Sequence, residues 1–251
     1  MTDIAVITCP PAEKSCAASP PLELPQIGFV VFSPGPHGSV VGRTDQGCTW
    51  YFAARPQELV LSPAGQYCFN RVVGSGYTMT RWSVSVSGQH EQESIDAISY
   101  LGKEEYDFVL QNGRRARVSE RPSSANRFSG EWSYELADPG TGLNIETTVH
   151  AGPGKQVAMA RSEMSGSVAI TSRGGRLEAR TSGGCRWALV ARGNTAELQP
   201  RRQTCVLGNS SETLTFWSIE STGDRQVSIM AGTHGQGSFL LGNGGLTRRA
   251  S

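Results

Sequence analysis

The chain of 251 residues lacks a long hydrophobic run, a strong charge imbalance and the apolar spacing typical of amphipathic helices. Because it has no stretch of about 18 or more apolar residues, it offers no candidate transmembrane helix. Its net charge is only +1, and it has no basic stripe of the kind that binds phosphate backbones. The sequence therefore predicts neither a helical membrane protein nor a partner for nucleic acid.

The motifs of common enzyme classes are also incomplete. The segment that starts at His90 begins like the zinc-protease helix, but Ser94 stands where the second histidine ligand would be. The four histidines lie far apart in the sequence, and no Gly-x-Ser-x-Gly elbow is present. Glu104, Glu105 and Asp107 could supply paired carboxylates for glycoside chemistry, although a solvated strand edge explains them more simply. The sequence favours a protein that is not an enzyme, with no catalytic residue, no metal and no cofactor.

What the chain has in abundance is glycine, with 30 residues, and proline, with 13. In residues 80–86 and 213–219, polar and apolar side chains largely alternate, as they do in a strand with one buried face. Turn-forming residues stand at the ends of such runs. Asn112-Gly113 and Asn243-Gly244 predict hairpin turns, because both residue types tolerate positive φ. Turn signals about every ten residues predict an all-β fold, and leave open whether it is a β-sandwich or a β-barrel.

One segment of the chain occurs twice. Arg43–Cys68 and Arg180–Cys205 align without a gap and share 11 of 26 residues. The similarity continues to residues 117 and 248 with small changes of offset, as expected if only surface turns gain or lose residues. Two copies are too few for a solenoid. The sequence therefore predicts tandem duplicated small β-domains.

The two predicted domains span residues 28–117 and 166–251. Residues 118–165 have no matching segment in the first half, and they contain three extended runs. We expect these inserted strands to join the second domain. Residues 1–27 contain five prolines, and Pro-rich segments of this kind cannot pack a core. They are therefore predicted to form a leader or stalk.

The six cysteines follow the repeat, because the spacing within one copy recurs in the other. This recurrence predicts an internal disulfide in each domain and a third bond in the leader: Cys48–Cys68, Cys185–Cys205 and Cys9–Cys16. The alternative is a zinc site or free thiols. Zinc ligands usually lie two to four residues apart, and no Cys-x-x-Cys is present.

Disulfide bonds form in oxidising compartments, so they predict an extracellular or periplasmic protein of the cell envelope. No signal peptide is visible, because residues 1–9 are too short for a charged region followed by an apolar one. We expect a targeting segment to be absent from this sequence. The alternative is a cytosolic protein whose thiols remain free.

Tryptophan and arginine recur at equivalent positions of the two copies, and they are the candidate binding residues. The simpler interpretation makes each tryptophan a core residue beside a disulfide, with an arginine packed on the indole. The alternative makes them an exposed face for a glycan, peptide or polymer, which two copies would bind with avidity. The recurring candidates are Trp50, Trp82, Arg117, Trp187, Trp217 and Arg248, and Trp132, which has no counterpart in the first copy, is added to them.

Two resemblances add to this reading. The segments Cys-x-Trp…Leu-x-Pro-x-x-Gln-x-Cys and Phe-x-Leu-x-Asn-Gly-x-x-x-Arg resemble poorly characterised β-rich exported proteins and lipoproteins of myxobacterial type, which implies a place in the cell envelope. Gly130-Glu131-Trp132 is similar to the first-strand motif of the calycins, the lipocalin-like ligand barrels. That similarity implies that Arg248 on the last strand packs across Trp132.

These observations predict a non-catalytic, exported binding or structural module of the cell envelope. A first alternative is a calycin-like carrier, which needs an apolar cavity of about 300 Å³ or more for a small apolar ligand. A second is a hydrolase with a histidine or carboxylate cluster assembled in space. The expected partner is a surface polymer, a protein or a small apolar ligand, and a monomer is expected.

Overall fold

The protein is described by a computed structural model, which covers residues 3–10, 21–72, 75–101, 104–117, 125–151, 157–174, 176–235 and 237–249. Most of these residues lie in β-strands, and the helical segments among them are two single 3-10 turns, η1 (Pro36–Gly38) and η2 (Ala125–Arg127). The chain forms two compact units that divide after Arg117. The all-β prediction is confirmed.

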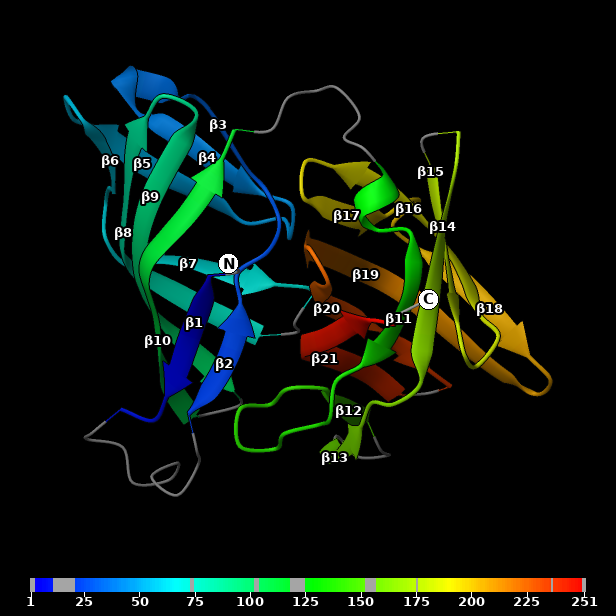
Figure 1. Cartoon of the computed structure of the whole chain (residues 1–251). Helices are drawn as coiled ribbons and strands as arrows, with labels where there is room; N and C mark the ends of the chain where they lie inside the picture. The colour runs from blue at the N-terminus through cyan, green and yellow to red at the C-terminus, as the bar shows by residue number, and fades with distance from the viewer. Residues whose placement is uncertain are drawn as a thin grey trace. The chain divides into compact units, whose positions relative to one another are not determined.

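The first unit is one antiparallel sheet of ten strands that curls into a half-barrel (Figure 1, blue to green). Its strand order is β2-β1-β10-β9-β8-β6-β5-β4-β3, and β7 pairs with β8 beside this path. The strands are β1 (Ile4–Thr8), β2 (Leu22–Pro25), β3 (Val30–Pro34), β4 (Val40–Thr44), β5 (Thr49–Ala54), β6 (Glu58–Leu61), β7 (Gln66–Asn70), β8 (Ser75–Ser87), β9 (His90–Leu101) and β10 (Glu104–Ala116).

The second unit is a closed barrel of eight strands (Figure 1, green to red). The ring runs β11-β14-β15-β16-β17-β19-β20-β21 and closes where β21 pairs with β11, while the β12–β13 hairpin extends from β21 and β18 pairs with β19. The strands are β11 (Gly130–Tyr134), β12 (Ile145–Ala151), β13 (Val157–Glu163), β14 (Ser167–Arg173), β15 (Arg176–Thr181), β16 (Arg186–Arg192), β17 (Thr195–Leu198), β18 (Gln203–Leu207), β19 (Ser210–Thr222), β20 (Arg225–His234) and β21 (Gly237–Arg248).

Strand for strand, β3–β10 of the first unit correspond to β14–β21 of the second, and the registers agree. Phe52 lies opposite Leu61 in β5 and β6, and Leu189 lies opposite Leu198 at the equivalent positions of β16 and β17. Register is fixed by which residues face the core, since a slip of one residue would turn every side chain to the other face. The equal registers support the inference of a tandem duplication.

The described parts of residues 1–27 are strands of the first sheet, which differs from the predicted leader or stalk. Their pairing repeats that of the β12–β13 hairpin: Ile7 lies opposite Phe108, as Thr148 lies opposite Phe239. The Asp3 carboxylate accepts a hydrogen bond from the backbone of Arg114, and Asn144 does the same for Gly245. The duplicated unit therefore begins near residues 3 and 144, and the segment without a counterpart is 118–143 rather than 118–165.

Each unit has its own core beside its own disulfide. The bonds Cys48–Cys68 and Cys185–Cys205 both span 20 residues, so the two predicted disulfides inside the domains are confirmed and the zinc alternative is wrong for these four residues. The third predicted bond includes Cys16, which lies outside the described residues. In the first core, Trp82 packs edge-on against Phe52 with ring centroids 5.2 Å apart.

The Asn-Gly pairs are not hairpin turns, because they lie inside the long strands β10 and β21. In β10 the register shifts between Leu110 and Gly113, and Asn112 has a φ of 57°. The Asn-Gly pair in β10 thus forms a β-bulge, which uses the same tolerance of positive φ without reversing the chain. A hairpin turn does lie at Gly193-Asn194, between β16 and β17, with Gly193 at a φ of 59°.

Candidate functional site

The five predicted tryptophans are core residues, so their rings do not form the exposed binding face that was one alternative. Their exposed fractions are between 0% and 2%. Each indole belongs to the apolar core of its own unit. The tryptophans therefore stabilise the two units and offer no surface to a ligand: Trp50, Trp82, Trp132, Trp187 and Trp217.

The two predicted arginines have different surroundings. The guanidinium carbon of Arg248 lies 4.2 Å from the centroid of the Trp132 ring, as the calycin resemblance implies. Arg248 also donates hydrogen bonds to the backbone carbonyls of Ser129 and Arg127. Arg117, the equivalent residue of the first unit, is exposed, and no tryptophan occupies the position equivalent to Trp132 among the described residues of that unit.

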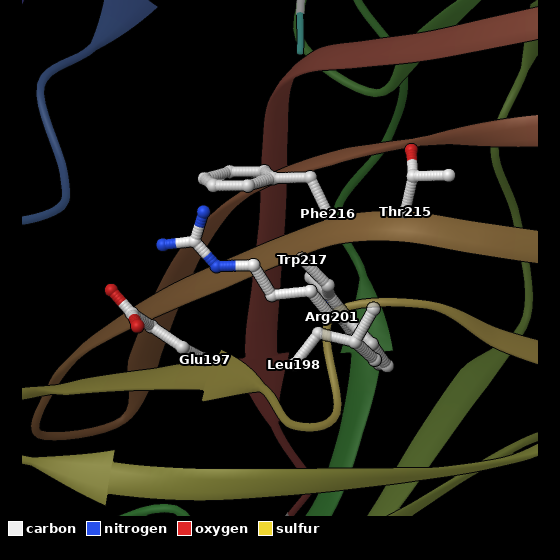
Figure 2. A pocket seen from close by; sticks show the side chains of 6 residues that line it. All are labelled: Glu197, Leu198, Arg201, Thr215, Phe216 and Trp217. Atoms are coloured by element: carbon white, nitrogen blue, oxygen red, sulfur yellow. The ribbon is translucent and has the colours of Figure 1, made fainter. Parts of the chain in front are cut away.

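The cavity in Figure 2 lies on the second unit beside β17 and β19, and it cannot hold an apolar ligand. It has a volume of about 10 Å³, which is room for about one water molecule. Figure 2 shows Arg201 extending between the ring of Phe216 and the carboxylate of Glu197, while Trp217 points to the other side of the sheet. This space gives no support to the carrier hypothesis.

A larger cleft of about 370 Å³ lies on the second unit beside the Cys185–Cys205 disulfide. Polar residues of the β18–β19 turn line much of it, together with Glu212 and His234. These two residues lie opposite each other on β19 and β20. The His234 ring stacks on Phe239 with centroids 4.1 Å apart, which fixes the direction of its ring nitrogens.

Glu212 and His234 of the cleft interact with Glu146 and Tyr134 nearby, and these contacts shift the pKa values of several of the groups. His234 Nε2 lies 3.4 Å from Glu146 Oε1, and the hydrogen bond to Glu146 raises the pKa of His234. Burial raises the pKa of the half-buried Glu212 and that of Tyr134, whose hydroxyl also feels both carboxylates. A histidine between two carboxylates can transfer a proton. The described residues contain no group of three or more His, Cys, Asp and Glu placed to hold a metal ion.

The first unit presents aromatic side chains on the outer face of β7 and β9, which we call the aromatic platform: the exposed Tyr67 and Phe69 on β7 and the partly buried Tyr100 on β9. Tyr67 is 61% exposed and Phe69 is 54% exposed. The rings of Tyr67 and Tyr100 lie 6.5 Å apart. A Cβ atom on Gly76 would lie 2.3 Å from the Tyr67 hydroxyl, so the missing side chain of Gly76 lets Tyr67 lie across β8.

The platform continues into polar residues of the neighbouring strand. Tyr100 lies opposite Glu105, and Ile98 lies opposite Asp107. Residues that lie opposite each other in neighbouring strands point to the same face of the sheet. The aromatic rings and the two carboxylates therefore share one face. The sequence contained one signal for this surface: since Cys68 points to the disulfide, its neighbours Tyr67 and Phe69 must point outward.

A partly buried ionic cluster on the inner side of the half-barrel was not predicted from the sequence, and we call it the Arg115 network. Arg115 Nε lies 2.8 Å from Glu93 Oε1 and 3.4 Å from Glu91. The Trp82 indole donates a hydrogen bond of 2.9 Å to Glu93. Burial raises the pKa of Glu91 although Arg115 lowers it. At the equivalent positions the second unit has uncharged residues: Trp217, Gln226, Ser228 and Leu246.

Comparison with known proteins gives little further information. No family model matches the chain, and no curated protein matches it. A crystal structure titled as that of a "putative outer membrane protein" from Bacteroides fragilis is similar over 99% of this chain and 96% of that chain, with 7% sequence identity and a TM-score of 0.28. A TM-score this low supports no conclusion about fold or function.

The two disulfides bear on the compartment in which the protein is found. The bonds Cys48–Cys68 and Cys185–Cys205 suggest an extracytoplasmic location, because disulfides persist in oxidising compartments. Across the part of the chain that the structure describes, none of the helices has the length and apolar character needed to span a bilayer.

Proposed function

We propose that the protein is an exported, non-catalytic binding module of the cell envelope that holds a glycan on the aromatic platform of its first unit. The observation that carries this proposal is the exposure of Tyr67 and Phe69 beside Tyr100, on a sheet whose inner side is filled by Trp50 and Trp82. Exposed apolar side chains that gather in one place mark interaction surfaces.

The chemistry of the platform fits a sugar polymer. The face of an aromatic ring carries partial negative charge, and the axial C–H groups of a pyranose carry partial positive charge, so the two surfaces pack together. The carboxylates of Glu105 and Asp107 on the same face can accept hydrogen bonds from sugar hydroxyls. An open surface of rings suits an extended chain rather than an enclosed small molecule.

The test is affinity electrophoresis of the protein through gels that contain soluble β-glucan, xylan or peptidoglycan fragments. We expect at least one polymer to retard the protein, and the double variant Tyr67→Ala/Phe69→Ala to weaken binding at least about tenfold, since two aromatic anchors are lost. The matched control is Val206→Ala, which removes an exposed side chain, 68% exposed, at the second-unit position equivalent to Phe69. Equal retardation of the wild type and the double variant would refute the assignment.

A second candidate is hydrolysis in the cleft of the second unit, favoured by the His234–Glu146 contact of 3.4 Å next to Glu212. Here Glu212 or His234 would act as the general acid and the other as the base. Chromogenic glycosides and esters would test it, with Glu212→Gln and His234→Gln as variants. Turnover that survives both substitutions would not come from this cleft.

A further inference from the structure

The two units differ at one strand. In the second unit β11 closes the barrel, because Trp132 lies opposite Val168 of β14 on one side and opposite Arg248 of β21 on the other. The equivalent strands of the first unit are β3 and β10. Among the described residues no strand pairs with the outer edge of β3, which ends the sheet path, or with the last residues of β10 on the side away from β9.

We call the open side of the half-barrel between β3 and the last residues of β10 the gap. Side chains along the gap are less buried than their equivalents in the closed barrel. Val168 and Ile170 of β14 are both 1% exposed, whereas Val30 and Phe32 of β3 are only partly buried. Along the other strand, Leu246 of β21 is 2% exposed, whereas the side chain of Arg115 at the equivalent position of β10 is 24% exposed. The apolar inner side of the half-barrel is therefore partly uncovered where β11 covers the second unit.

Arg117 marks the same gap. Its equivalent Arg248 holds the strand that closes the second barrel, through the Trp132 ring at 4.2 Å and the carbonyl oxygens of Ser129 and Arg127. Arg117 is exposed at the end of β10, at the position from which a guanidinium would reach an aromatic ring on an inserted strand. A cation over an aromatic face stabilises a contact by about 0.5–2 kcal/mol.

We propose that the half-barrel is a strand acceptor: an extended segment of another polypeptide chain, with an aromatic residue facing Arg117, inserts between β3 and β10 and closes the barrel. Strand addition of this kind draws its affinity from backbone hydrogen bonds and its specificity from alternate side chains. The second barrel supplies the template, because β11 makes these contacts with β14 and β21.

The template also fixes the register and part of the partner's chemistry. The aromatic residue lies opposite Val30 on β3 and opposite Arg117 on β10, the equivalents of Val168 and Arg248. Two residues later the inserted strand faces Arg115, at the position where Tyr134 faces Leu246 in the second unit. A tyrosine or a carboxylate suits that second position, because its oxygen accepts a hydrogen bond from the guanidinium of Arg115.

The test uses the 251-residue chain and a fluorescent peptide with the sequence of residues 126–136, NRFSGEWSYEL, whose binding is followed by anisotropy. We expect saturable binding that falls at least about tenfold when alanine replaces the peptide's tryptophan. Arg117→Ala in the protein should weaken binding about tenfold, within the two- to thirtyfold range of a cation–π contact. The matched control is Arg114→Ala, which removes an exposed guanidinium from the other face of the same strand and should change binding less than about twofold.

Hydrogen exchange with the peptide bound locates the site. Protection of amides in residues 29–32 and 115–117 supports the proposal. Protection confined to 167–170 and 246–248 would mean that the peptide has replaced β11 in the second barrel, and it would overturn the proposal. Absence of binding at 1 mM peptide (about −4 kcal/mol), or equal binding to the Arg117→Ala variant, would overturn it as well. None of these outcomes depends on glycan binding by the aromatic platform.

Discussion

Replacing Arg115 by leucine, the residue at the equivalent position 246, should destabilise the first unit. The substitution removes the 2.8 Å ion pair with Glu93 and leaves a carboxylate whose side chain is 2% exposed without its cation. Breaking a fully buried pair costs about 3–5 kcal/mol. Because the Arg115 side chain is 24% exposed, water compensates part of the loss, and we expect a cost near the lower limit, about 3 kcal/mol.

The double variant Glu93→Ser/Arg115→Leu gives the first unit the same residues as the second at these two positions. It removes the buried Glu93 charge together with its partner, so the remaining losses are the acceptor of the Trp82 indole and the weaker contact of Arg115 with Glu91 at 3.4 Å. The second unit tolerates this state, since Trp217 Nε1 is buried without a hydrogen-bond partner. An unsatisfied buried donor costs about 1–3 kcal/mol. We therefore expect the double variant to be more stable than the single variant Arg115→Leu by about 1 kcal/mol or more.

The measurement is urea unfolding at pH 5 and at pH 8. Unfolding of the first unit is monitored by hydrogen exchange in peptides from that unit. In Arg115→Leu the pKa of Glu91, which burial already raises, is expected to rise further, because Glu91 loses the cation that lowers it. A carboxyl group with a folded pKa above its unfolded pKa stabilises the fold at low pH and loses that contribution as pH rises. The single variant should therefore lose more stability at pH 8 than at pH 5. A double variant no more stable than Arg115→Leu would refute the reasoning.

Three further outcomes are expected. Replacing both Cys185 and Cys205 by serine should destabilise the second unit by about 3 kcal/mol and leave hydrogen exchange in residues 29–117 unchanged; equal losses in both units would contradict independent folding. Gly130→Ala should destabilise the second unit by about 1–3 kcal/mol, because Gly130 has a φ of 134° and its Cβ would lie 2.6 Å from an Arg248 nitrogen; calorimetry showing no change would contradict this. The wild type should lose stability as pH rises through the raised pKa of His234, and His234→Gln should flatten this slope; parallel stability curves for the two proteins would rule out a contribution from His234.

The repeated segment predicted more of the fold than any other feature of the sequence. Equal Cys spacing was enough to predict the two domain disulfides, since a duplicated backbone brings equivalent cysteines to equivalent places. The repeat was missed over residues 3–27, because β1 and β12 share a pairing pattern but little sequence. Ile7 pairs with Phe108 as Thr148 pairs with Phe239, and backbone pairing does not require identical side chains.

The candidate sites were harder to predict, for two physical reasons. Alternation shows which residues share a face of a strand, but it does not show which face is the core. A disulfide cysteine two residues earlier indicates the face of Trp50 and of Trp187, whereas Trp82, Trp132 and Trp217 have no such neighbour. The cleft cluster is assembled from β12, β19 and β20, and the spacing of Glu146, Glu212 and His234 along the chain carries no trace of their contact. The aromatic platform could have been inferred from the alternation around Cys68.

The charge on the inner side of each unit follows from whether the ring is closed. In the closed second barrel the position equivalent to Arg115 is Leu246, which is 2% exposed, and a guanidinium there would be cut off from water at high cost. In the half-barrel Arg115 keeps 24% of its side chain exposed, so its hydration is only partly lost. A strand that closes the half-barrel would remove that water, and it must therefore offer a hydrogen-bond acceptor to Arg115. An entirely apolar strand should for this reason bind more weakly than one with a tyrosine or a carboxylate two residues after the aromatic residue.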